Sequence, residues 1–134
     1  MLKTLYKPFR TNLQHDCFEF QQVIIFEAMK AIWNGQVLAE SEAVLVYDGV
    51  YYFPPESIKS DFFNKSDTYT ICSRKGKALY FNIAVNGQVN FDAAWYYPTL
   101  EGSDKKISNY IAFWKGVEFE SWGVQLINIF IFLH

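Results

Sequence analysis

The chain has 134 residues, of which 51% are hydrophobic and 19% aromatic, and its formal net charge is −2. This length predicts one domain that buries a core without metal or disulfide staples. The slight negative charge and the absence of long runs of one sign exclude a protein that binds nucleic acid through a basic stripe. The 13 Phe and nine Tyr residues favour strands over helices.

Cysteine usage and hydropathy bear on the compartment. The two cysteines, Cys17 and Cys72, do not make a disulfide framework, and neither has a partner at zinc-site spacing. The N-terminus lacks the apolar stretch of a secretory signal. The longest apolar run, residues 126–133, is interrupted by Asn128 and is too short to cross a bilayer. We therefore expect a cytoplasmic protein with no metal, no cofactor and no membrane contact.

Turn residues divide the chain into short segments typical of antiparallel strands. Asn34-Gly35 and Asn86-Gly87 predict hairpins, because a two-residue hairpin turn needs positive φ at both central positions. Pro54-Pro55 ends the fourth expected strand. The expected strands are 31–33, 36–39, 44–47, 50–53, 69–73, 77–85, 89–92 and 111–114. Residues 57–66 are expected to form a loop or short helix.

Residues 103–110 form the one expected helix, with Ser103 as its N-cap. The whole pattern predicts a mainly β fold, a compact small barrel or sandwich of short antiparallel strands with one short helix.

The two ends differ in composition from the middle. Residues 1–28 are expected to be an atypical N-terminal extension, residues 29–120 the β domain, and residues 121–134 an apolar tail. An exposed tail of this kind is prone to aggregate. The tail either pairs with residues 23–26 or packs as a terminal helix. The third alternative is that the native protein lacks one or both of these ends. A homo-oligomer held by the apolar termini is a further possibility.

The block Cys72–Tyr80 predicts a hairpin. Residues 74–76 form a three-residue loop in which Gly76 takes the left-handed position. Cys72 then pairs with Ala78, whereas a two-residue loop would pair Cys72 with Leu79 and mismatch the apolar sets. The expected core face carries Tyr69, Ile71, Leu79, Phe81, Ile83 and Val85. The opposite face carries Thr70, Cys72, Ala78, Tyr80 and Asn82.

The orientation of Asp92 depends on the next hairpin. If the apolar pattern sets the register through a bulge, Val85 pairs with Val89 and Asp92 joins the face of Cys72 and Tyr80. If the Asn86-Gly87 turn sets the register, Val85 pairs with Gln88 and Asp92 points the other way. Both alternatives stay open at this point.

Cys72 is either a small buried apolar residue or a reactive thiol. Arg74 and Lys75 lie close in sequence, and neighbouring cations lower the pKa of a thiol. The only histidines, His15 and His134, lie in the atypical ends, so catalysis by a Cys-His or Ser-His pair is not expected. Zinc-ligand spacing, phosphate-binding loops and dinucleotide-binding motifs are also absent from the sequence.

Aromatic residues and one carboxylate make the second dense block. Asp92 either caps a turn or serves as a general base or hydrogen-bond acceptor. Trp95, Tyr96 and Tyr97 cannot all face one side of a strand. At least one of them is therefore expected at the surface or in a cleft, where Trp and Tyr suit stacking on a sugar or base.

Five ordered blocks carry a resemblance to a bacterial family, the domain of unknown function 427, which is sometimes labelled nucleotidyltransferase-type. The blocks are residues 29–35, 52–55, 72–80, 92–98 and 112–117. In the family these positions typically read M-K-A-x-W-N-G, Y-F-P-P, C-x-x-K-G-x-A-x-Y, D-A-A-W-Y-Y-P and A-F-W-x-G-V. The resemblance implies a compact, mostly β domain.

We expect a small-molecule-binding β module for an uncharged or anionic ligand. The expected ligand-binding residues are Arg74, Lys75, Tyr80, Asn82, Trp95, Tyr96 and Tyr97. The two cations would contact an anion, the aromatic rings would stack, and Asp92 would accept hydrogen bonds. The alternatives are an enzyme with Cys72 and Asp92 as catalytic residues, and a structural or protein-interaction domain.

Overall fold

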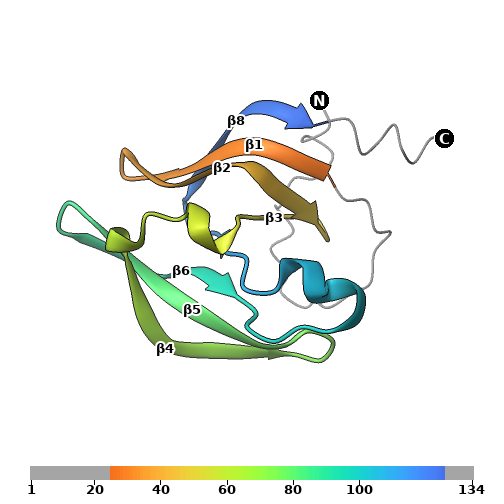
Figure 1. Cartoon of the computed structure of the whole chain (residues 1–134). Helices are drawn as coiled ribbons and strands as arrows, with labels where there is room; N and C mark the ends of the chain where they lie inside the picture. Colours follow the sequence, from red (N-terminus) through yellow and green to blue (C-terminus); the bar gives the residue numbers. More distant parts are fainter. Residues whose placement is uncertain (1–24, 126–134) are drawn as a thin grey trace.

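The computed structural model describes residues 25–125, which form eight strands in two antiparallel sheets (Figure 1). One sheet has the order β3-β2-β1-β8 and the other the order β4-β5-β6-β7. The strands are β1 (Ile25–Trp33), β2 (Gln36–Tyr47), β3 (Val50–Tyr52), β4 (Phe63–Cys72), β5 (Gly76–Val85), β6 (Gln88–Tyr96), β7 (Ala112–Phe113) and β8 (Glu118–Gln125). The prediction of a mainly β, antiparallel fold is confirmed, and the architecture is sandwich-like.

Left-handed turns join neighbouring strands within the sheets. Asn34-Gly35 has φ values of 53° and 76°, and Asn86-Gly87 has φ values of 52° and 80°, as the hairpin prediction requires. Asp48-Gly49 makes the same turn between β2 and β3, with φ values of 54° and 78°. Strand β2 is continuous over 36–47, where the sequence predicts two shorter strands.

The described residues contain no α-helix; three short 3-10 turns stand in its place. They are η3 (Pro55–Ser57), η4 (Ser60–Phe62) and η5 (Gly102–Ile107). The predicted helix at 103–110 corresponds to η5, whose N-cap is Glu101 and has no side-chain cap, so the assignment of Ser103 as N-cap is wrong. The turn ends at Ile107 because Ser108 leaves the helical region with ψ 129°.

The β structure extends past both expected domain boundaries. Strand β1 starts at Ile25, before residue 29, and β8 ends at Gln125, after residue 120. The expected strands stop at residue 114, whereas β8 pairs with β1 along most of its length. The predicted contact of the C-terminal tail with residues 23–26 lies outside the described residues, as do His15, Cys17 and His134. No helix in the described part is long and apolar enough to cross a membrane.

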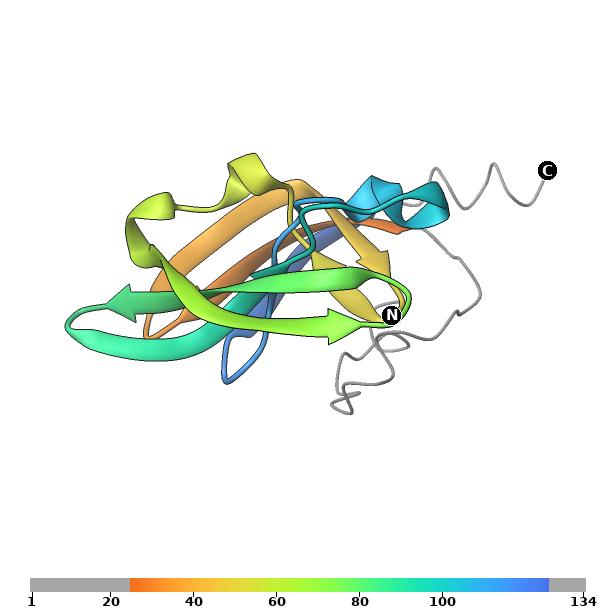
Figure 2. The ribbon, with the colours of Figure 1, turned by 90° about the horizontal axis from the view of Figure 1, so that it is seen from below.

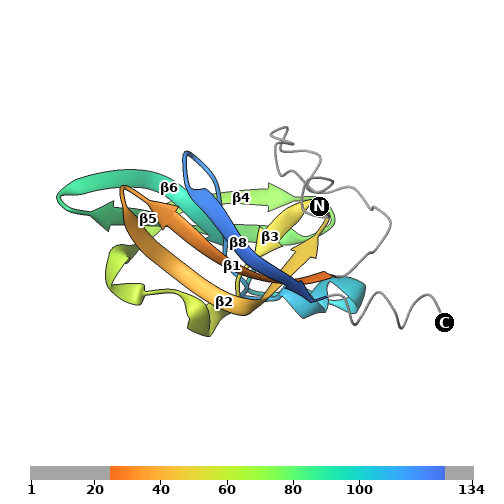
Figure 3. The same cartoon turned by 90° about the horizontal axis from the view of Figure 1, so that it is seen from above.

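The main hydrophobic core lies between the two sheets, which Figures 2 and 3 show from below and from above. Phe53 joins the sheets, because its backbone N–H and C=O both bond to Ile111 at 2.8 Å. Its ring packs edge-on against Phe113, with ring centroids 5.4 Å apart. The buried members of this core are Met29, Ala31, Leu38, Ala39, Val44, Val46, Tyr51, Phe53, Ile83, Val85, Ala93, Ala94, Ile111, Phe113 and Val117.

A second buried cluster lies on the opposite face of β5 and β2. Its members are Leu45, Tyr47, Tyr52, Cys72, Ala78, Tyr80, Tyr97, Leu100, Ile107 and Ala112. Leu100 and Ile107 come from the segment between β6 and β7, which includes η5. Strand β5 therefore buries both faces, with Ile83 and Val85 in the first core and Ala78 and Tyr80 in the second.

The predicted faces of the first hairpin are only partly right. Phe81, Ile83 and Val85 do face the main core, but Tyr69 and Ile71 are 56% and 69% exposed. Both lie on β4, the edge strand, where the opposite sheet does not cover them. The face expected to lie away from the core is the one that the second cluster buries.

The predicted register of this hairpin is wrong. Cys72 pairs with Gly76, not with Ala78, so the loop is residues 73–75. Gly76 has the expected positive φ, 84°, but it is the first residue of β5 and not the last residue of the loop. The reason lies in Arg74 and Lys75, which sit at the loop tip and reach carboxylates elsewhere in the chain.

The second hairpin has the register set by its turn, and the pairing of Val85 with Val89 that the apolar pattern favoured does not occur. Near the Asn86-Gly87 turn Val85 pairs with Gln88, as the turn chemistry predicts. A bulge in β6 then shifts the register, so that Phe81 pairs with Ala94. Asp92 lies in that bulge with φ 57°. A second bulge, in β4 between Lys65 and Tyr69, flanks β5 on its other side.

Burial in the core predicts that two Phe→Ala substitutions change the free energy of unfolding by very different amounts. Phe53→Ala removes a fully buried ring, and we expect it to lower the free energy of unfolding by about 3–5 kcal/mol. Phe91→Ala removes a ring that is 63% exposed and should change it by about 0.5 kcal/mol or less. Equilibrium urea denaturation measures both values. Similar losses in the two variants would contradict the assignment of Phe53 to the junction between the sheets.

Candidate functional site

Asp92 connects three strands and the residue that follows β7. Its carboxylate accepts hydrogen bonds from the hydroxyls of Ser66, at 2.6 Å, and Thr68, at 2.9 Å, in the β4 bulge. Its backbone N–H donates to Asn82 Oδ1 of β5 at 2.8 Å. Its carbonyl accepts a bond of 2.6 Å from the indole Nε1 of Trp114. These four bonds fix both the left-handed backbone and the direction of the carboxylate.

Three aromatic rings contact one another on the strands next to Asp92 and on the residue after β7. Tyr80 and Trp95 are direct cross-strand partners, with ring centroids 6.4 Å apart. The ring of Trp114 meets that of Trp95 edge to face at 6.1 Å. The hydroxyl of Tyr80 lies 3.1 Å from Thr70 Oγ1 on β4. We call Tyr80, Asn82, Asp92, Trp95 and Trp114 the Asp92 face.

Apolar surface continues beyond Asp92 along β6. Val89 is 47% exposed and Phe91 is 63% exposed. Val89 pairs with Ala84, whose neighbours Ile83 and Val85 point into the main core. Because side chains alternate along a strand, Val89 and Phe91 project from the opposite, outer side of the sheet. Exposed apolar side chains that lie together on one strand are typical of contact surfaces.

Four of the predicted site residues therefore come together: Tyr80, Asn82, Asp92 and Trp95. Of the two tyrosines that follow, Tyr96 points to the other side of the strand, as alternation predicts, whereas Tyr97 lies in the same buried cluster as Tyr80. Tyr96 stacks on Phe81 at the main core, with ring centroids 5.3 Å apart. Tyr97 is buried in the second cluster, beneath the Lys75 ammonium at 5.5 Å from its ring centre.

Arg74 and Lys75 take part in an ion cluster within the protein. Arg74 binds Asp104 through Nη1 at 2.7 and 2.8 Å, and Asp48 through Nη2 at 2.8 Å. The Lys75 ammonium, which is fully buried, lies 3.1 Å from the same Asp48 oxygen. The Tyr47 hydroxyl donates to Asp104 at 2.6 Å. The two cations and two carboxylates balance, and they join the β2–β3 turn, the β4–β5 loop and η5.

These contacts shift three pKa values. Burial alone would raise the pKa of Asp104, but hydrogen bonds from Tyr47 and Arg74 hold it below its ordinary value. Burial would lower the pKa of Arg74, and the two carboxylates raise it instead. Burial and the hydrogen bond to Asp104 raise the pKa of Tyr47 to about 12. Asp104 and Arg74 therefore form a charged pair at neutral pH.

Cys72 lies at the edge of the second cluster and is 7% exposed. Its sulfur accepts a hydrogen bond from the backbone N–H of Lys75 at 3.2 Å and is disulfide-bonded. A thiolate nucleophile at this position would first require reduction of that bond, because only the thiolate attacks. The enzyme hypothesis for Cys72 and Asp92 stays a prediction.

Several residues of these clusters do not follow from the sequence. Ser66, Thr68, Asp48 and Asp104 become neighbours of the predicted residues only through pairing between distant segments. Trp114 could have been identified from the sequence, because it lies in the fifth of the blocks that resemble the family. Among residues 25–125, no three His, Cys, Asp or Glu side chains gather in a way that could hold a metal ion.

The lowered pKa of Asp104 predicts a pH-dependent contribution to stability. A carboxyl whose folded pKa lies below its unfolded value stabilises the fold above the unfolded pKa and loses this effect as pH falls through the folded pKa. Wild type should therefore exceed Asp104→Asn in unfolding free energy at neutral pH, and the difference should shrink below about pH 4. Urea denaturation between about pH 7 and pH 3 measures it. The control is Asp61→Asn, an exposed aspartate of η4. A difference that stays constant with pH would contradict the charged pairing.

The comparisons with known proteins identify a family. No curated protein matches the chain. A family model described as a domain of unknown function, DUF427, matches residues 25–125, which is the range from the start of β1 to the end of β8. The match covers most of the chain and confirms the resemblance stated from the five sequence blocks. The chain therefore belongs to the DUF427 family.

Proposed function

We propose that the Asp92 face binds a small, uncharged, planar molecule that carries a hydrogen-bond donor. The observation that carries this proposal is the Asp92 carboxylate, which is fixed by two hydroxyls on the strand that also carries Trp95 and the exposed Phe91. A carboxylate has about four acceptor positions, and Ser66 and Thr68 use one on each oxygen. Capacity remains for a donor from a ligand.

The aromatic residues supply the second half of the recognition. Trp95 and Trp114 are each only partly buried, so they present ring surface on which a planar group could stack. Phe91, the residue before Asp92, offers a further exposed ring. A planar ligand held by rings and oriented by one carboxylate fits the usual pattern of small-molecule sites, which combine apolar lining with few polar groups.

The ion cluster favours an uncharged ligand over an anionic one. Arg74 and Lys75 lie within 3.1 Å of carboxylate oxygens of Asp48 and Asp104. An anion that recruited them would have to displace these partners, and breaking a buried ion pair typically costs several kcal/mol. We therefore assign ligand contact to Tyr80, Asn82, Asp92, Trp95 and Trp114, and a positioning role to Arg74 and Lys75.

A thermal-shift screen with neutral planar compounds tests the proposal, using nucleobases, nucleosides and aromatic amides as probes. A ligand at about ten times its Kd adds about 1.4 kcal/mol to the unfolding free energy, which raises Tm by several degrees. Asp92→Asn should weaken binding at least about tenfold, because a hydrogen bond to a charged group is lost. Trp95→Phe should also weaken it.

The matched controls are Asp61→Asn and Trp33→Phe, which change the same residue types outside the Asp92 face. Both should keep the wild-type Kd. Amide cross-peak shifts on ligand addition should map to β5 and β6. The proposal would be contradicted if the Asp92→Asn variant bound a ligand from the screen as tightly as wild type does. A screen in which no compound raises Tm would contradict it as well.

A further inference from the structure

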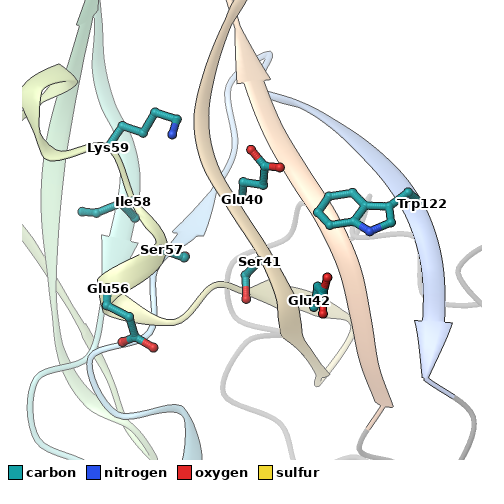
Figure 4. Close-up of a pocket in the computed structure, with 8 residues that line it drawn as sticks. All are labelled: Glu40, Ser41, Glu42, Glu56, Ser57, Ile58, Lys59 and Trp122. Carbon is teal, nitrogen blue, oxygen red and sulfur yellow. The ribbon is translucent and has the colours of Figure 1, made fainter.

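A hollow of about 520 Å³ lies on the other sheet, away from the Asp92 face (Figure 4). Figure 4 shows Trp122 of β8 on one side, residues 56–59 on the opposite side, and the side chains of residues 40–42 of β2 between them. Segment 56–59 is held beside β2 by a bond of 2.7 Å from Lys59 N–H to the carbonyl of Leu38. The volume falls within the range of sites for small organic molecules, roughly 300–1,000 Å³.

The lining of this hollow is acidic. Glu40, Glu42, Glu56 and Lys59 contribute to it, which gives a formal charge of −2. The ion pairs found among the described residues join Arg74 and Lys75 to Asp48 and Asp104, and none of them involves these three glutamates. The glutamates are solvent-exposed, so their carboxylates can reach a ligand at little desolvation cost.

Trp122 gives the hollow an aromatic wall and an indication of the ligand chemistry. The side chain is 48% exposed, which is unusual for the largest of the aromatic residues. The Lys30 ammonium already lies 5.9 Å from its ring centre, so the ring receives a cation from within the chain. Lys30 is also the cross-strand partner of Glu40. Aromatic faces beside carboxylates are the usual recognition surface for organic cations.

We propose that this hollow binds an organic cation, an ammonium or guanidinium group on an apolar stem. The charged end lies against the carboxylates of Glu40 and Glu42. The stem packs on the ring of Trp122. A free amine and a Lys or Arg side chain of a peptide share this chemistry. The inference is independent of the proposed function, since it rests on a different sheet and on different residues.

An NMR titration that follows the indole N–H signal of Trp122 tests the proposal. The signal is assigned by its loss in the Trp122→Phe variant. The probes are n-butylammonium, and n-butanol as the matched neutral compound. Butylammonium should shift the Trp122 signal with a Kd of about 1–10 mM, whereas butanol at equal concentration should not. Higher salt should weaken the binding, because both partners are exposed charges.

Two double variants separate the site from net charge. Glu40→Gln with Glu42→Gln should raise the Kd at least about threefold, since two attractive charges at the site are lost. Glu101→Gln with Glu118→Gln changes the net charge equally at exposed positions outside the lining and should leave the Kd unchanged. All four glutamates are exposed, so both variants are expected to fold, which circular dichroism checks.

The peptide acetyl-(Lys)4-amide distinguishes the two sources of the cation. Tighter binding per charge than butylammonium supports a basic peptide, and equal binding supports a free amine. Either result agrees with the proposal. An unshifted Trp122 signal with both cations would overturn it. An equal shift with butanol, or an unchanged Kd in the Glu40/Glu42 variant, would overturn it as well.

Discussion

The left-handed conformation of Asp92 is the constraint on which the arrangement of the β4–β5–β6 sheet and its outer face depends. Bulges in β4 and β6 lie on either side of β5, and Asp92 joins them through bonds to Ser66, Thr68 and Asn82. A non-glycine residue at φ 57° is strained unless its surroundings fix it, and here they do so on the backbone and on the side chain. Strain of this kind, held by a polar network, is typical of positions that serve recognition.

The ion cluster likewise fixes the chain at the other end of the same sheet. Buried charges are costly unless they are paired, and the cluster pairs Arg74 and Lys75 with Asp48 and Asp104. Because these partners come from three separate connections, the cluster fixes η5 against the two hairpin loops. That contact closes the second hydrophobic cluster around Tyr80 and Tyr97. The residues that seemed suited to bind an anion therefore stabilise the neighbourhood of the candidate site.

Local chemistry explains how far the sequence could predict this structure. Asn34-Gly35 and Asn86-Gly87 determine their turns by themselves, and alternation correctly separates Tyr96 from Trp95. The pairing of Cys72 with Gly76 depends instead on carboxylates 26 and 30 residues from Arg74. The bulge at Asp92 depends likewise on hydroxyls 24 and 26 residues away. Such long-range contacts override a register that is read from apolar pattern alone.

The central claim is that contacts within the protein hold Asp92 in position before any ligand binds. A double-mutant cycle with Ser66→Ala and Asp92→Gly measures this most directly, because glycine keeps the positive φ while the carboxylate is removed. The predicted coupling free energy is about 1.5–3 kcal/mol, the value for a hydrogen bond to a charged group. Additive losses from the two substitutions would contradict the claim.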